Sequence, residues 1–159
     1  MTFDIRPVVD ADADKLIKLI GDCFSEYEGV FIDLSDLDAD LKAYETALSF
    51  QNGEGFVAVA QDGEIVGSVA CAPSGENCFE LKRLYLSERL RGTGMGLKLL
   101  KLAEDTARSR GATMMDAWSD TRFTRAHRFY EREGYVKEQE TRELNDISET
   151  IEFYFTKTF

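Results

Sequence analysis

Hydrophobic and polar positions follow two different periods along this chain, and the periods separate helices from strands. Apolar residues spaced three and four positions apart predict helices over 10–24, 35–49, 97–110 and 120–133. Runs rich in β-branched and aromatic residues predict strands over 3–8, 55–60, 65–70, 78–86, 112–118, 135–140 and 150–158. This order predicts an α/β fold, in which a mixed, mostly antiparallel sheet of about seven strands is flanked by four helices.

Turns and crossovers fix how several of these strands connect. The Asp-Gly pair at 62–63 separates two β-rich runs, which predicts a hairpin between 55–60 and 65–70. The strands 78–86 and 112–118 lie on either side of one helix. We therefore expect these two strands to be parallel neighbours joined by a right-handed crossover.

Length and composition are those of an ordinary globular protein. At 159 residues the chain has the size of one domain, and we expect residues 1–159 to form it. Hydrophobic residues make up 43% and charged residues 31% of the chain. Because there is no membrane-length apolar run and no signal-peptide pattern, we expect a cytoplasmic protein without membrane partners.

The charge is strongly acidic and unevenly distributed. The formal net charge is −11, which disfavours a nucleic-acid partner. Residues 1–50 contain 12 acidic and 4 basic side chains, so most of the excess lies in the first third. This acidity either attracts a cationic substrate or simply keeps the protein in solution.

The cysteines and the single histidine do not form a recognisable metal-ligand pattern. Three cysteines, an odd number, argue against a disulfide framework and favour reduced thiols. Only one histidine, His127, is present, and the cysteine spacing matches no common ligand set. We therefore expect no metal, and we expect His127 to lie on a helix surface.

A glycine-rich segment, 91–96, connects an apolar strand to an amphipathic helix. Its glycines at alternate positions allow a ligand to approach the main chain, and the following helix presents free N–H groups. This combination predicts a pyrophosphate site, although a tight turn without a ligand has the same composition. A Walker loop is excluded because no Lys-Ser or Lys-Thr pair follows. A dinucleotide loop is weakened because Leu97 replaces its third glycine, while Asp116 lies at the distance of its ribose-binding acid.

Two segments together resemble a known enzyme family. Glu80–Leu86 followed by Arg91–Gly96 resembles motif A of the GNAT acetyltransferases, and Ala126–Tyr135 resembles the family's later helix and strand. The resemblance implies the GNAT acyltransferase fold over the chain, with acetyl-CoA as donor and an amine of a small molecule or protein as acceptor. One position departs from it, because Phe123 stands where many members carry Asn.

The resemblance also implies where the cofactor binds. It places the pyrophosphate on the glycine-rich loop and the pantetheine arm on the main chain of the preceding strand. The residues so implied are Leu84, Tyr85, Leu86, Arg91, Gly92, Thr93, Gly94, Met95 and Gly96.

Two residues match the family's acid and base positions. Tyr130 corresponds to the general acid that protonates the leaving thiolate, although a tyrosine packed on its helix has the same spacing. Glu80 corresponds to the base of histone-type members. It is equally readable as a surface carboxylate paired with Lys82 or Arg83.

The acceptor and the assembly are less defined by motif. The resemblance implies an acceptor pocket formed mainly by the first two helices, their connecting loop and the last strands. Tyr27, Glu28 and Phe31 are then the candidate lining, although a solvated loop explains the same residues. The apolar terminal strand 151–155 suggests a homodimer by strand pairing. The alternative function is a non-catalytic module that binds acyl-CoA as a sensor.

Overall fold

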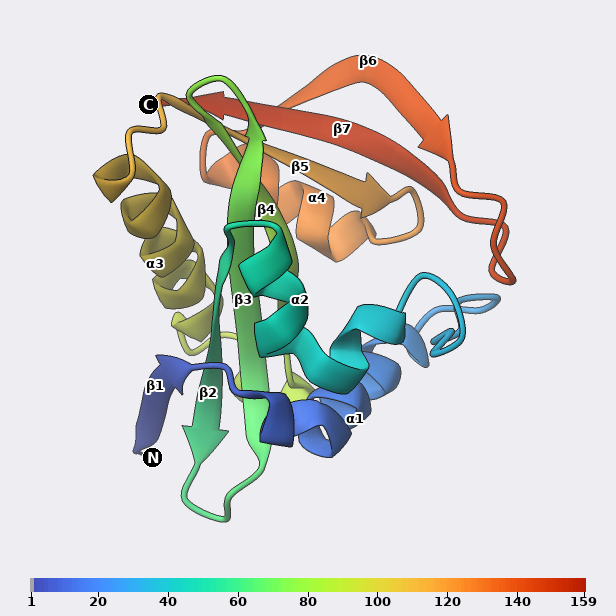
Figure 1. The fold of residues 1–159 in the computed structure, drawn as a ribbon. Helices are drawn as coiled ribbons and strands as arrows, with labels where there is room; N and C mark the ends of the chain where they lie inside the picture. Colours follow the sequence, from blue (N-terminus) through green and yellow to red (C-terminus); the bar gives the residue numbers. More distant parts are fainter. Residues whose placement is uncertain (1) are drawn as a thin grey trace.

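A computed structural model describes residues 2–159 and contains one seven-stranded sheet (Figure 1). Its strands lie in the order β1-β2-β3-β4-β5-β7-β6. Their bounds are β1 Phe3–Pro7, β2 Glu54–Ala60, β3 Ile65–Gly75, β4 Cys78–Leu86, β5 Met114–Asp120, β6 Val136–Glu143 and β7 Ile151–Thr158. All neighbouring pairs are antiparallel except β4 and β5, which are parallel. The predicted fold class, the hairpin and the parallel pair are therefore confirmed.

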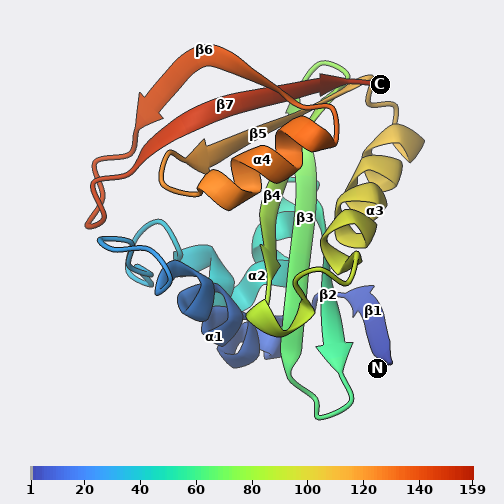
Figure 2. The ribbon, with the colours of Figure 1, turned by 180° about the vertical axis from the view of Figure 1, so that it is seen from behind.

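The helices cover the two faces of the sheet unequally. The α-helices are α1 Ala13–Phe24, α2 Tyr44–Phe50, α3 Met95–Ser109 and α4 Thr124–Arg132, with short 3-10 helices at Asp10–Asp12, Ala39–Ala43 and Glu88–Leu90. Figures 1 and 2 show α1 and α2 on one face, and α3 and α4 on the other. Each pair of helices covers its own hydrophobic cluster. No helix within residues 2–159 is long and apolar enough to cross a membrane.

The sheet opens between its two parallel strands. β4 and β5 pair only from Cys78–Glu80 to Met114–Asp116, after which they separate. The pairing of β3 with β4 shifts register beyond Ser68, next to Arg83, whose φ is +52°. Such a bulge bends the strand and changes its alternation. As a result Leu84 packs against the α3 side and Tyr85 against the α1 side.

Two predicted helices begin later than their sequence patterns suggest. The second is a 3-10 turn over Ala39–Ala43 followed by α2, because the Asp38 carboxylate accepts the Asp33 N–H and thereby holds the preceding segment in a turn. The fourth begins at Thr124 because Asp120 is the last residue of β5 and its carboxylate binds Arg122.

Two further expectations are corrected by the packing. His127 is 9% exposed rather than on the surface, and its ring lies 3.1 Å from the Ser119 hydroxyl. Strand β7, which contains 151–155, is paired with β5 on one side and with β6 on the other. Because this strand has no free edge, it is not available for pairing with a second copy.

Candidate active site

The glycine-rich loop presents unpaired main-chain donors at the start of α3. Among the described residues, the N–H groups of Gly92, Gly94, Gly96 and Leu97 have no hydrogen-bond acceptor. The φ angles of Gly92 and Gly94 are +79° and +84°, which favour glycine. Free N–H groups at the positive end of a 15-residue helix form a site for an anion.

The space beside this loop is open. A Cβ atom built on Gly92 or Gly94 would meet no heavy atom within 4 Å, and one on Gly96 would only touch Leu86 at 3.8 Å and Phe129 at 4.0 Å. These glycines are therefore not required by packing inside the protein. Their backbone angles and the free space fit a phosphate-bearing ligand against the main chain.

Arg91 lies at this loop but already has an anionic partner. Its Nη2 is 2.6 Å from an oxygen of Glu26, which follows α1, and Arg125 Nη1 lies 3.4 Å from the same carboxylate. The Glu26 carboxylate thus supplies the negative charge that Arg91 binds beside the loop. A phosphate that binds Arg91 must share or replace this contact.

A cavity of about 990 Å³ joins the loop to the opening between β4 and β5. Of the residues predicted for the site, it is lined by Tyr27, Phe31, Glu80, Leu84, Tyr85, Leu86, Arg91, Gly92, Gly94, Gly96 and Tyr130. Three others do not line it: Glu28, Thr93 and Met95. Thr93 donates its hydroxyl to the Leu90 carbonyl, and the Met95 side chain is buried in the core.

Tyr130 combines a packed ring with an unengaged hydroxyl. Its ring lies 5.7 Å from that of Tyr135 and 5.4 Å from that of Phe155, centre to centre. Burial raises the pKa of Tyr130 to about 12, so the phenol stays protonated at neutral pH. No hydrogen bond of its hydroxyl is found within residues 2–159, and the residue lines the cavity. The ring of Tyr130 therefore packs in the core, while its hydroxyl is free to donate a proton.

Glu80 lies where β4 leaves β5. Its nearest cation is Lys82, whose Nζ is 3.9 Å from the carboxylate. Burial raises the pKa of Glu80 above its ordinary value, and Asp116 on the neighbouring strand adds to this rise. Arg83, the other partner expected from the sequence, instead binds Asp38 and Asp40, each at 2.8 Å.

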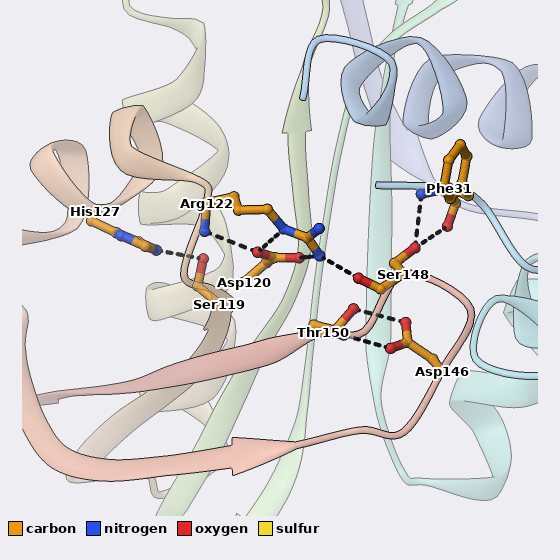
Figure 3. Close-up of polar contacts among 8 residues, drawn as sticks. All are labelled: Phe31, Ser119, Asp120, Arg122, His127, Asp146, Ser148 and Thr150. Atoms are coloured by element: carbon orange, nitrogen blue, oxygen red, sulfur yellow. Dashed lines mark hydrogen bonds and ion pairs between the residues drawn. The ribbon is translucent and has the colours of Figure 1, made fainter. Parts of the chain in front are cut away.

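Hydrogen bonds join two loops that are far apart in the sequence at one wall of the cavity, and we call this set of contacts the clasp (Figure 3). Ser148, in the β6–β7 loop, accepts the Phe31 N–H at 2.8 Å and donates to the Phe31 carbonyl at 3.2 Å. Arg122 binds both oxygens of Asp120 and donates to the Ser148 carbonyl at 3.0 Å. The sequence carries no spacing signal for this clasp, because 117 residues separate its members.

Phe123 takes part in an aromatic group at the cavity wall. Its ring lies 4.8 Å from that of Tyr27 and 5.9 Å from that of Phe24. The position where many GNAT members carry Asn is therefore apolar here and supports the α1 side of the cavity. Among the described residues no cluster of His, Cys, Asp and Glu is arranged to hold a metal ion, and the three cysteines are free thiols.

The strand separation between β4 and β5, together with the free amides at the start of α3, fits a diphosphate-bearing ligand. Residues 14–135 match the family model described as "Acetyltransferase (GNAT) family". The chain therefore belongs to the GNAT acetyltransferases and is an acetyl-CoA-dependent acyltransferase.

Individual relatives agree with this assignment. An acetyltransferase of Agrobacterium fabrum is 33% identical over 137 residues, which cover 86% of this chain and 85% of the relative. An N-acetyltransferase of Archaeoglobus fulgidus is 30% identical over 126 residues, or 76% of this chain and 86% of the relative. The crystal structure of the PaiA N-acetyltransferase of Thermoplasma acidophilum in complex with coenzyme A has the same fold. Its TM-score is 0.76 at 21% identity, and the match covers 100% of both chains.

Proposed function

We propose that residues 1–159 act as a single GNAT domain that transfers the acetyl group of acetyl-CoA directly to a primary amine of a small molecule or protein. The observation that carries the proposal is that one cavity joins the free amides of 92–97 to the unengaged Tyr130 hydroxyl. All groups invoked belong to one chain. The proposal therefore requires no second copy.

The cofactor contacts follow from the main chain. The N–H groups of Gly92, Gly94, Gly96 and Leu97 would bind the diphosphate. β4 beyond Glu80 is no longer paired with β5, so its main chain near Leu84–Leu86 is open to an extended pantetheine arm. This arrangement is strand addition, in which hydrogen bonds to the backbone supply affinity without side-chain recognition.

The reaction needs three proton movements. The amine nitrogen attacks the thioester carbonyl and the carbon–sulfur bond breaks, while the Tyr130 hydroxyl gives its proton to the departing thiolate. The proton that the new amide nitrogen must lose then returns to the Tyr130 oxygen. The ammonium form of the acceptor first loses its proton to Glu80, whose raised pKa makes this carboxylate a better base than an exposed one. Holding the amine against the thioester supplies the remaining acceleration through proximity.

Two measurements separate an enzyme from a sensor. Saturating acetyl-CoA should raise the melting temperature through linkage, whereas NAD and ATP should not. Thiol release should then appear when amines are added. A thermal shift without thiol release from any amine would favour the acyl-CoA sensor, and the absence of a thermal shift would reject the cofactor site.

A further inference from the structure

One side of the cavity, here called the acceptor side, is lined by residues of β5, β6 and β7. Among them are residues on the face of the sheet that α4 does not cover. Figures 1 and 2 show α4 on one face of β5, β7 and β6, with no helix of the described chain on the other. The side chains of Trp118, Arg142 and Glu152 line the cavity from this uncovered face, next to Glu80 and Lys82 of β4. A substrate that reaches the opening between β4 and β5 contacts these groups.

Most of the carboxylates on this side of the cavity accept hydrogen bonds from the protein. Donors at 2.7 to 2.9 Å reach every acid here but one: Arg83 binds both Asp38 and Asp40, Arg122 binds Asp120, Arg142 binds Glu152, and the neutral N–H and hydroxyl of Thr150 bind Asp146. The exception is Glu80, which accepts no hydrogen bond from the described residues and has only Lys82 at 3.9 Å. One carboxylate therefore remains for an ammonium group.

Two of the cations on this side have hydrogen-bond donors that no group of the described chain uses. Arg83 is held by two aspartates, but Lys82 donates no hydrogen bond within the described chain. Arg142 donates only its Nε to Glu152, at 2.7 Å, and its guanidinium lies 4.4 Å from the centre of the Trp118 ring. Its Nη donors are unengaged, and the side chain is 43% exposed. Stacking on the indole fixes the orientation of these donors.

We propose that the acceptor is a small zwitterion, in which the primary amine binds beside Glu80 and an anionic group, carboxylate or phosphonate, binds Lys82 and Arg142. This inference rests on the proposed amine acetylation and names its substrate class. A diamine fits less well, because its second cation would lie beside the two cations Lys82 and Arg142. A guanidinium with free Nη donors matches the geometry of carboxylate and phosphonate oxygens.

Matched amines test the proposal in the thiol-release assay. β-Alanine and 2-aminoethylphosphonate carry the anion, propylamine and ethanolamine lack it, and putrescine replaces it with a second cation. The anionic amines should have a kcat/KM about tenfold or more above their uncharged counterparts, since unpaired site charges penalise analogues that lack the partner. The ratio between the two anionic amines shows whether carboxylate or phosphonate is preferred.

Variants assign the effect to the two cations. Lys82→Gln and Arg142→Gln should each remove most of the preference for the anionic amines, measured as the ratio of kcat/KM for β-alanine to kcat/KM for propylamine. The double variant Arg142→Gln/Glu152→Gln avoids an unpaired Glu152 and should behave like Arg142→Gln. Arg108→Gln is the matched control, because Arg108 also stacks on an aromatic ring, that of Phe159 at 4.2 Å, but does not line the cavity.

The proposal is overturned if propylamine or putrescine is acetylated as well as β-alanine and 2-aminoethylphosphonate. It is also overturned if the variants lower the kcat/KM of all amines equally, or if no amine in the panel releases thiol while acetyl-CoA still raises the melting temperature. Loss of the acetyl-CoA thermal shift in the wild type would instead reject the proposed function itself.

Discussion

In the proposed function, the cofactor half of the cavity is built from main-chain groups of one continuous segment, whereas the acceptor half is built from side chains of segments far apart in the sequence. In the first half, the donors are the free amides of Gly92, Gly94, Gly96 and Leu97. In the second half, Phe31 and Ser148 meet although 117 residues separate them. On this proposal, backbone geometry holds the ligand that is common to the family, and the acceptor is selected by side chains that can change without disturbing that geometry.

The largest expected effect comes from the backbone half. Gly94→Val should weaken acetyl-CoA binding by about 100-fold or more, because a branched Cβ at φ +84° is strained and enters the space beside the free amides. Isothermal titration calorimetry measures this loss. Gly75→Ala is the control, since Gly75 has open space around it without a positive φ. Unchanged affinity in a folded Gly94→Val protein would contradict the backbone account.

Tyr130 lies between the two halves, and its hydroxyl should matter for turnover only. Tyr130→Phe should lower kcat by about 10- to 100-fold, because the thiolate loses its proton donor, and should leave the dissociation constant of acetyl-CoA nearly unchanged. Tyr135→Phe removes a hydroxyl from the neighbouring ring, one that is bound to Glu104, and should retain kcat. Equal losses of kcat and affinity in Tyr130→Phe would make this tyrosine structural.

Glu80 should show opposite effects on activity and stability. Glu80→Gln should lower kcat/KM by about tenfold and remove the acidic limb of its pH profile, because the base is lost. Burial raises the pKa of Glu80, so its contribution to folding stability is complete below the ordinary pKa of the carboxyl and is lost as the pH rises through the raised value.

The variant should therefore gain melting temperature relative to the wild type as the pH rises above the ordinary pKa of the carboxyl. Glu76→Gln, at an exposed position in the preceding turn, should change neither property. A pH profile that keeps its acidic limb in Glu80→Gln would transfer the role of base to another group or to water.

The smallest effect is expected for Glu26, whose carboxylate binds Arg91 at the edge of the cofactor half of the cavity. Glu26→Gln should tighten acetyl-CoA binding by about two- to fivefold, because the diphosphate no longer competes with a carboxylate for the guanidinium. Acetyl-pantetheine, which lacks the diphosphate, should bind both proteins equally. Glu28→Gln serves as the control, since Glu28 does not line the cavity. Weaker binding to Glu26→Gln would show that the carboxylate orients Arg91 instead of competing for it.

The same division explains how much the sequence could predict. The glycine loop was predictable because positive φ angles at Gly92 and Gly94 demand a residue type that is visible in the sequence. The parallel pair β4 and β5 was predictable because one helix separates two strands. Both features depend on residues that are close together along the chain.

The acceptor half was less predictable because tertiary contacts decide how its side chains are used. The Asp38 carboxylate binds Arg83, and the Asp120 carboxylate binds Arg122. The helices predicted to begin near residues 35 and 120 therefore begin later than their periodicity suggested. His127 reads as a surface residue on helical spacing, yet its ring packs 5.1 Å from that of Phe155. Satisfied and unsatisfied charges, such as Glu152 and Glu80, look alike until the structure shows their partners.

The most direct test of the account follows individual amides by ¹⁵N NMR during a titration with coenzyme A and, in parallel, with pantetheine. We expect the signals of Gly92, Gly94, Gly96 and Leu97 to shift strongly with coenzyme A alone, and those of Leu84–Leu86 to shift with both ligands. If coenzyme A binds but leaves the four loop amides unmoved, the diphosphate is held elsewhere and the account is contradicted.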